Sequence, residues 1–243
     1  MRLMNTAKLD PEPARQQDKT LADLAFSRVR EDLLAGYLAP GVRLKLSELQ
    51  KRYDLGLSPL REALMRLAAE DLVVAEGQRG FTVASMSLDE LRDLTRTRER
   101  IEALALADAM EKGDADWEAE ILASYHRLVR APLPQQGDGD PVAMVQWEAK
   151  HRAFHRSLVA ACGSPWLLRF LQQLAEHSER YRRVRMLHSP PSEPLAYNVE
   201  KEHEDIMQAV LARDLGRASS LMSAHLRRTA ATVEAYWAPG SGR

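Results

Sequence analysis

Hydrophobic and polar positions along the first third of the chain follow two different periods. Between about residues 21 and 69, apolar side chains recur every three or four positions, the spacing of one helix face. Two breaks divide this pattern into three short helices. The next stretch, "LVVAEGQRGFTVA", alternates apolar residues around Gly77 and Gly80, which is typical of a two-stranded β-ribbon with a tight turn. Three helices followed by a ribbon predict a winged helix-turn-helix.

Hydroxyl residues stand where the second and third helices are expected to begin. Ser47 is followed three positions later by Gln50, the order of a capping box, so we expect Ser47 to cap the second helix. Ser58 directly precedes Pro59, a residue suited to the first helical turn, so we expect Ser58 to cap the third helix.

From residue 87 onwards only the helical period is found. Stretches that contain proline and glycine separate six long helical patterns and read as loops. Six helices with short links predict an antiparallel bundle. The expected fold class is therefore mainly α: an N-terminal winged helix-turn-helix followed by an all-α six-helix antiparallel bundle. The six patterns cover about 88–112, 114–130, 143–162, 164–187, 195–212 and 214–236.

These patterns divide the chain into a winged helix-turn-helix domain over residues 20–84 and a helical domain over 85–237. Residues 1–19 and 238–243 are expected to be flexible ends. The composition, 45% hydrophobic and 28% charged, suits a soluble globular protein. We find no apolar run that could cross a bilayer and no secretory signal, so no membrane partner is expected. The single cysteine excludes an intrachain disulfide, and a cytoplasmic location is expected.

The winged helix-turn-helix order predicts which residues contact double-stranded DNA. The second helix of the helix-turn-helix pair enters the major groove, and the wing reaches the minor groove. Arginine can grip a phosphate or read guanine, although surface arginines on a solvated helix face are common. The net charge of −1 decides nothing, because an acidic second domain can offset a basic surface. The residues expected at DNA are Ser58, Arg61, Arg66, Lys45, Arg79 and Gly80.

Four histidines fall on the apolar faces of three predicted helices. His151 and His155 are one turn apart on one helix, whereas His203 and His225 lie on two later helices. A bundle can bring such positions together, and three or more neutral imidazoles around one point can bind zinc or nickel. The alternative is that they are core residues that only hold the bundle together.

Arginine residues also occur where the helical pattern expects an inward side chain. Arg98 lies on an otherwise apolar stripe, so it either forms a buried salt bridge with Glu102 or grips a carboxylate ligand with its guanidinium fork. Arg180 and Arg182, in "ERYRRVR", either join the same pocket or form a solvated face.

The segment "PGVRLKLSELQKRYDLGLSPLREALMRLAAEDLVVAEGQRGFTVA" resembles the winged-helix domain of the GntR family of bacterial transcription regulators. The "PG", "PLREAL" and "RGFTVA" motifs carry the resemblance. The helical remainder resembles the FCD ligand-binding domain of the FadR-type branch, and "GLSPLREAL", "GFTVASMS" and "HRAFH" are most similar to its CsiR-like members. The resemblance implies that the arginine of "PLREAL" lies on the recognition helix. At two departures, Leu57 and Ser47, a basic residue is common in the family. They imply either an operator that differs from that of the fatty-acid branch or compensation by other side chains.

The resemblance also implies a ligand set for a metal. His155, His203 and His225 occupy the family's three histidine positions, and His151 replaces its aspartate, which leaves open whether His151 or Glu148 completes the site. This change should favour zinc, with nickel or manganese as alternatives. The family's effector-binding arginine corresponds to Arg98.

Together these features predict a homodimeric, ligand-responsive transcription regulator, expected to be a repressor, that binds a pseudo-palindromic operator. Its effector would be a small carboxylate, for which the CsiR-like resemblance implies a dicarboxylate such as glutarate, and the link "ASMSLDE" would pass the signal to the DNA-binding domain. The alternative is a histidine-ligated helical-bundle metalloenzyme with Glu148 or Glu202 as general base.

Overall fold

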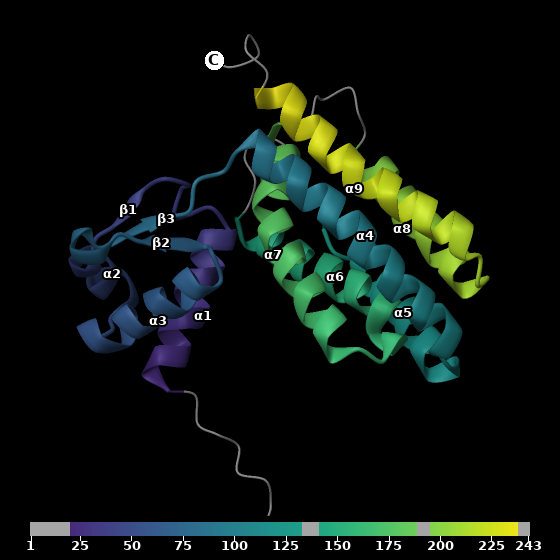
Figure 1. Cartoon of the computed structure of the whole chain (residues 1–243), viewed down its shortest axis with the longest axis horizontal. Helices are drawn as coiled ribbons and strands as arrows, with labels where there is room; N and C mark the ends of the chain where they lie inside the picture. Colours follow the sequence, from purple (N-terminus) through teal and green to yellow (C-terminus); the bar gives the residue numbers. More distant parts are fainter. Residues whose placement is uncertain (1–19, 133–140, 189–194, 238–243) are drawn as a thin grey trace, which may run out of the picture.

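The computed structural model of this protein describes residues 20–132, 141–188 and 195–237. The two chain ends that were expected to be flexible, 1–19 and 238–243, lie outside the described residues. Within the described ranges the chain forms nine α-helices and one small sheet. Figure 1 shows a compact head, made of the first three helices and the sheet, beside a bundle of the later six helices. The predicted fold class is confirmed.

Three helices form the head: α1 (Leu21–Leu34), α2 (Leu46–Tyr53) and α3 (Leu57–Ala69). Thr20 caps α1, because its side chain accepts the amide of Asp23 while the Asp23 carboxylate accepts the Thr20 amide. The apolar faces of all three helices meet in one core, which includes Ala25, Val29, Leu33, Leu49, Leu60, Leu64, Leu67 and Phe81.

The predicted serine caps of α2 and α3 are wrong. The α2 helix begins one residue before Ser47, because the Lys45 carbonyl already accepts the amide of Leu49, and the partly buried Leu46 packs on the head core. The α3 helix likewise begins before Ser58, since the carbonyl of Gly56 accepts the first helical bond. Neither N-cap residue supplies a side-chain hydrogen bond.

The sheet contains the predicted ribbon and one further strand. The ribbon strands β2 (Val73–Ala75) and β3 (Phe81–Val83) pair antiparallel, and a 3-10 turn, Gly77–Arg79, joins them. The turn continues through Gly80 at φ 96°, a left-handed conformation that favours glycine. The additional strand β1 (Arg43–Leu44) pairs with the other edge of β3. Two residues are too short to show an alternating pattern, which is why the sequence did not reveal it.

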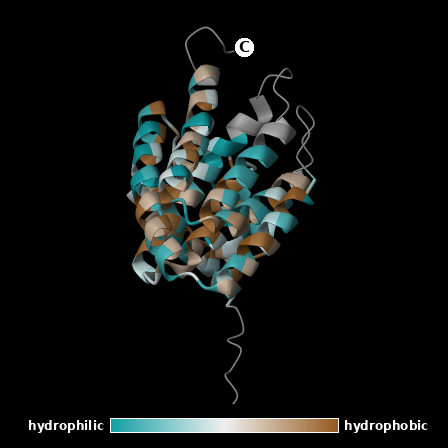
Figure 2. Cartoon of the chain, turned by 90° about the vertical axis from the view of Figure 1, so that its right-hand side faces the viewer, coloured by the Kyte–Doolittle hydropathy of each residue, from teal (hydrophilic) through white to brown (hydrophobic). Residues whose placement is uncertain are grey.

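The six predicted helices of the second part are all present. The α4 helix lies at their centre and contacts α6, α7, α8 and α9. Seen from the side away from the head, the helices carry hydrophilic and hydrophobic residues around their turns, as amphipathic helices do (Figure 2). No helix among the described residues is long and apolar enough to span a membrane. The bounds are α4 (Leu88–Lys112), α5 (Ala115–Val129), α6 (Pro141–Val159), α7 (Pro165–His188), α8 (Leu195–Leu211) and α9 (Leu215–Trp237).

Replacing Leu64 by alanine should destabilise the head. Leu64 is fully buried, so Leu64→Ala leaves a cavity and should lower the free energy of unfolding by about 2–5 kcal/mol. Its neighbour Met65 is 56% exposed, and Met65→Ala should change this free energy by less than about 0.5 kcal/mol. Urea denaturation followed by circular dichroism compares the two variants, and equal losses would show that this core does not stabilise the head.

Candidate metal centre and effector cavity

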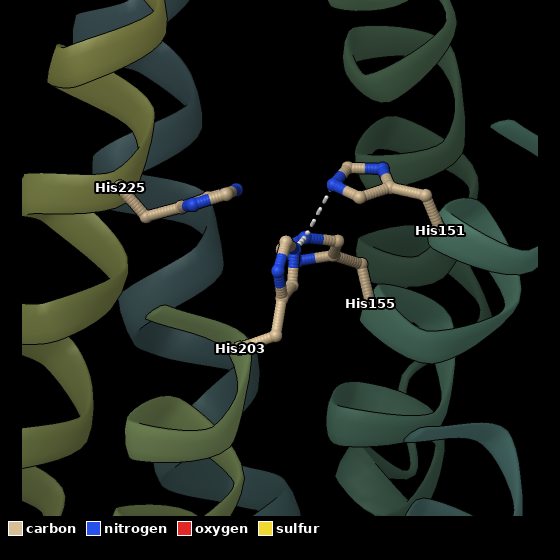
Figure 3. A group of neighbouring side chains, drawn as sticks. All are labelled: His151, His155, His203 and His225. Atoms are coloured by element: carbon tan, nitrogen blue, oxygen red, sulfur yellow. Dashed lines mark hydrogen bonds between the residues drawn. The ribbon is translucent and has the colours of Figure 1, made fainter. Parts of the chain in front are cut away.

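Three helices that are distant in the sequence bring four imidazoles together in the bundle. One ligand nitrogen from each ring lies within 4.8 Å of all the others. All four side chains are buried, the most exposed being His155 at 8%. Figure 3 shows the rings converging from the three ribbons. The α6 helix supplies His151 and His155, α8 supplies His203, and α9 supplies His225.

The nitrogen spacing of the cluster is that of ligands around one ion. The Nε2 atom of His155 lies 3.1 Å from Nε2 of His151 and 3.2 Å from Nε2 of His203. A zinc ion with bonds of about 2.0–2.1 Å holds its tetrahedral nitrogen ligands roughly 3.3–3.4 Å apart. The spacing of His151, His155 and His203 about the Nε2 atom of His155 therefore matches a tetrahedral site, and the four ligand nitrogens together lie within 4.8 Å of one another.

A carboxylate orients one ring from behind. The Nδ1 atom of His225 lies 2.7 Å from Oε2 of Glu202, which leaves Nε2 as the nitrogen available to the cluster. Glu202 is held in turn by Arg228. Carboxylates in this position fix the tautomer of a metal-binding histidine. Sequence reasoning gave Glu202 a role only as a general base in an enzyme, because its neighbourhood with His225 arises only when α8 packs on α9.

Burial keeps two of the rings neutral. It lowers the pKa of His151 well below its usual 6.5, and nearby Arg182 lowers this pKa further. Burial also lowers the pKa of His155, with His225 and His203 acting in the same direction. Neutral imidazole is the form that binds a metal, so these two residues need not lose a proton first at neutral pH.

Glu148 lies beside the cluster but is not part of it. Its carboxylate accepts two hydrogen bonds from Arg182, at 3.1 Å from Nε and 2.7 Å from Nη2. One carboxylate oxygen lies 3.9 Å from Nδ1 of His151. Of the two alternatives for the fourth position, the structure therefore brings His151 into the cluster and pairs Glu148 with an arginine.

A cavity opens beside the histidines between α4, α6, α7 and α9. Apolar residues form part of its wall, and the hydroxyls of Thr95, Ser178 and Thr229 supply polar groups. The side chains of Arg98 and Arg182 line the same space as His155. Mostly apolar walls with a few convergent polar groups are typical of small-molecule sites.

The two arginines at the cavity differ in how fully they are paired. Arg98 donates from Nη2 to Glu102 at 2.7 Å, which is the buried salt bridge that the sequence allowed. Its buried Nε atom has no hydrogen-bond partner among the described residues. Burial lowers the pKa of Arg98, and Glu102 only partly opposes this effect. For Arg182, burial alone would lower the pKa, but Glu148 raises it above the ordinary value. Arg98 is therefore the guanidinium that a further anion would stabilise.

Most residues expected at DNA lie on the surface of the head. Ser58 and Arg61 are exposed in the first turns of α3, and Arg79 is exposed in the turn between β2 and β3, directly before Gly80. Lys45 is exposed as well and pairs with Glu48 at 2.8 Å.

Arg66 is held differently from the other expected DNA contacts. It pairs with Asp23 at 2.7 Å and covers the ring of Phe26 at 4.3 Å, so its side chain packs against α1. Arg43, which sequence reasoning missed, donates to the Arg79 carbonyl at 2.5 Å and places a further basic residue at the wing. Its position depends on β1, the strand that the sequence pattern did not reveal.

The metal-free protein should lose stability as the solution becomes acidic. Because the pKa of His155 is lower in the folded chain, the unfolded chain takes up protons first as the pH falls below 6.5. The melting temperature in the presence of a chelator should therefore fall between about pH 7 and about pH 5. His155→Gln should flatten this dependence, whereas His126→Gln, at an exposed position on α5, should not. If the melting temperature depends on pH in the same way for the native protein, His155→Gln and His126→Gln, burial of neutral His155 does not cause the loss of stability.

Two family models match the chain, and together they span the head and the bundle. Residues 21–83 match the model of bacterial regulatory proteins of the gntR family. Residues 93–228 match the FCD domain. The solved structure of McbR/YncC from E. coli has the same fold, with a TM-score of 0.69 at 22% identity over 90% of this chain and 99% of that chain.

Two relatives match most of the chain in sequence. It is 41% identical over 219 residues to BphR of Paraburkholderia xenovorans, an HTH-type transcriptional regulator, covering 90% of this chain and 87% of that protein. It is 38% identical over 198 residues to the HTH-type transcriptional repressor GlaR of Escherichia coli, covering 82% and 89%. Both relatives are named as transcriptional regulators, which favours a regulator over the metalloenzyme alternative. The chain belongs to the GntR family of DNA-binding transcription regulators and carries an FCD domain.

Proposed function

We propose that this protein is a repressor whose helical domain binds a divalent metal and a small carboxylate, and that these ligands control operator binding by the head. The observation that carries the proposal is the convergence of four buried imidazoles beside a cavity with two buried arginines. The relative GlaR is a repressor, which supports the sign of regulation.

The donor set supports zinc as the metal. His151, His155, His203 and His225 offer four nitrogen ligands and no carboxylate, a set that suits zinc or nickel better than manganese, which prefers oxygen. When bound, the ion would supply a localised positive charge in a dry site. Four neutral ligands leave that charge uncompensated, so an anionic effector gains a further attraction.

The cavity supports a carboxylate as the effector. Arg98 has one buried hydrogen-bond donor left over, and Arg182 presents a second guanidinium from the opposite helix. Guanidinium binds carboxylate through paired hydrogen bonds. Two arginines in one cavity favour a dicarboxylate such as glutarate over a monocarboxylate.

The head supports operator binding through α3 and the wing. Ser58 and Arg61 would enter the major groove, and Arg79 and Gly80 would follow the minor groove. Lys45 would contact phosphate. Two heads of a homodimer would read the two halves of a pseudo-palindromic operator. Arg66 would contribute only after release from Asp23, so we rank it below Arg61 as a contact.

Arg61→Ala should weaken operator binding without unfolding the head. The side chain is exposed, and loss of one guanidinium contact to a base or phosphate should cost about 1–3 kcal/mol of binding free energy. A fluorescence titration with DNA from upstream of the protein's own coding sequence measures this loss. Arg127→Ala removes the same charge from an exposed position on α5 and should leave the affinity unchanged. Equal affinities for the Arg61 variant and the native protein would exclude Arg61 as a contact.

Arg98→Ala should abolish the response of DNA binding to glutarate and leave DNA binding itself intact. The comparison is the operator Kd with and without glutarate in zinc-loaded protein. Glu102→Gln breaks the same ion pair but keeps the guanidinium, so this variant should still respond. A normal response in Arg98→Ala would show that Arg98 does not bind the effector, and a loss in both variants would mean that the pair serves only to hold the bundle.

A further inference from the structure

The α7 helix faces the cavity with one side and the head with the other. Ser178, Tyr181 and Arg182 line the cavity. A second row on the same helix, two adjacent residues followed by two at intervals of three, contacts the head. Figure 1 shows α7 on the side of the bundle nearest the head. The row that contacts the head consists of Glu176, His177, Arg180 and Arg183.

The first half of this row contacts α1 and the end of α3. Glu176 forms an ion pair with Arg30 of α1, and these side chains are only 12% and 20% exposed. Arg30 also lies 3.7 Å from a carboxylate oxygen of Glu70, which follows α3. His177 Nε2 lies 2.9 Å from the backbone carbonyl of Glu70. One cluster therefore joins α7 to both helices that position the DNA-reading surface.

The second half of the row contacts two places: the junction between the head and the bundle, and the segment that follows α1. Arg180 donates to the backbone carbonyl of Ala84, directly after the last strand of the head. The guanidinium of Arg183 lies 5.9 Å from the centre of the Tyr37 ring. It also packs so closely on Gly36 that a Cβ atom there would lie 2.9 Å from Arg183 Nε. The head thus rests on α7 by specific contacts and not only through the covalent link.

Both rows of residues belong to one helix, α7, so a movement of one row moves the other. Arg182, which pairs with Glu148 at the cavity, is adjacent in sequence to Arg183, and Tyr181 is adjacent to Arg180. A helix transmits a shift or rotation along its length, whereas the junction of residues 84–87 has no regular structure. A carboxylate that competes with Glu148 for Arg182 would act on the same helical turn that docks the head.

We propose that α7 is the element that couples the effector cavity to the head, and that Arg30 and Glu176 are positioning residues of this coupling. The inference rests on the proposed function, because it takes the cavity as the effector site. Coupling through α7 differs from coupling through the junction of residues 84–87 alone. It depends on side-chain contacts, which can be removed by substitution without altering the junction. Two sites that bias one structural element are coupled, usually by about 5–150-fold in affinity.

The test compares the native protein with Arg30→Gln, using zinc-loaded full-length chain, glutarate as effector and the upstream DNA as operator. Arg30→Gln should bind glutarate within about twofold of the native affinity in calorimetry. Its ratio of operator Kd with and without glutarate should fall towards one, from a native ratio of about 5–150. Arg30→Lys keeps the charge and should recover most of the ratio. Arg227→Gln breaks an ion pair between α9 and α4, with Glu99, that does not involve the α7 row, and it should keep the native ratio.

A native ratio in Arg30→Gln would overturn the proposal. If the native protein does not bind glutarate, glutarate is not the effector. The coupling is then tested with a substitution at the cavity in place of a ligand. Glu148→Gln loosens Arg182 as a competing carboxylate would, so it should change the operator Kd in the native background. The effect of Glu148→Gln on the operator Kd should be smaller when Arg30→Gln is also present. The reason is that Glu148 and Arg30 both contact side chains of α7. Additive effects of the two substitutions on the operator Kd would contradict the coupling.

Discussion

The burial of four imidazole rings at one point in the bundle is the constraint on which the rest of the structure depends. Unpaired polar rings in a dry core cost free energy, and charged rings cost more. The fold meets this cost in part by keeping His151 and His155 neutral and by backing His225 with Glu202. The Nδ1 atoms of His151 and His155 have no hydrogen-bond partner among the described residues. A metal would take the Nε2 lone pairs, which face the cluster, whereas these two Nδ1 atoms lie on the other side of their rings.

Two buried arginines, Arg98 and Arg182, lie beside the histidine cluster. Arg182 donates to Glu148 from Nε and Nη2, whereas Arg98 retains a buried donor beside the cavity. Under the proposed function, a metal held by four neutral ligands would add positive charge beside these arginines. The same helix that carries Arg182 docks the head through Glu176, so the chemistry of the cavity and the position of the DNA-reading surface share one structural element.

Local patterns in the sequence were sufficient to predict the helices, the ribbon of the wing and the inward orientation of the four histidines. The three- and four-residue spacing places His151 on the same face as His155, and this holds in the structure without knowledge of any distant contact. The features that could not be predicted all depend on packing between distant segments. The β1 strand exists because β3 lies beside it, Glu202 reaches His225 only across two helices, and Arg30 meets Glu176 only when the head docks. The failed caps at Ser47 and Ser58 have a different cause, because the backbone carbonyl two residues before each serine already accepts the first helical hydrogen bond.

Zinc titration of chelator-treated protein tests the central claim most directly. The four converging imidazoles predict one zinc ion per chain, measured by calorimetry and by elemental analysis after dialysis. His203→Ala, which removes the fully buried ligand of α8, should reduce zinc affinity by at least about tenfold, while His126→Ala should retain it. If the native chain binds no zinc, nickel or manganese, or if His203→Ala binds zinc as tightly as the native chain, the cluster is a structural core and not a metal centre.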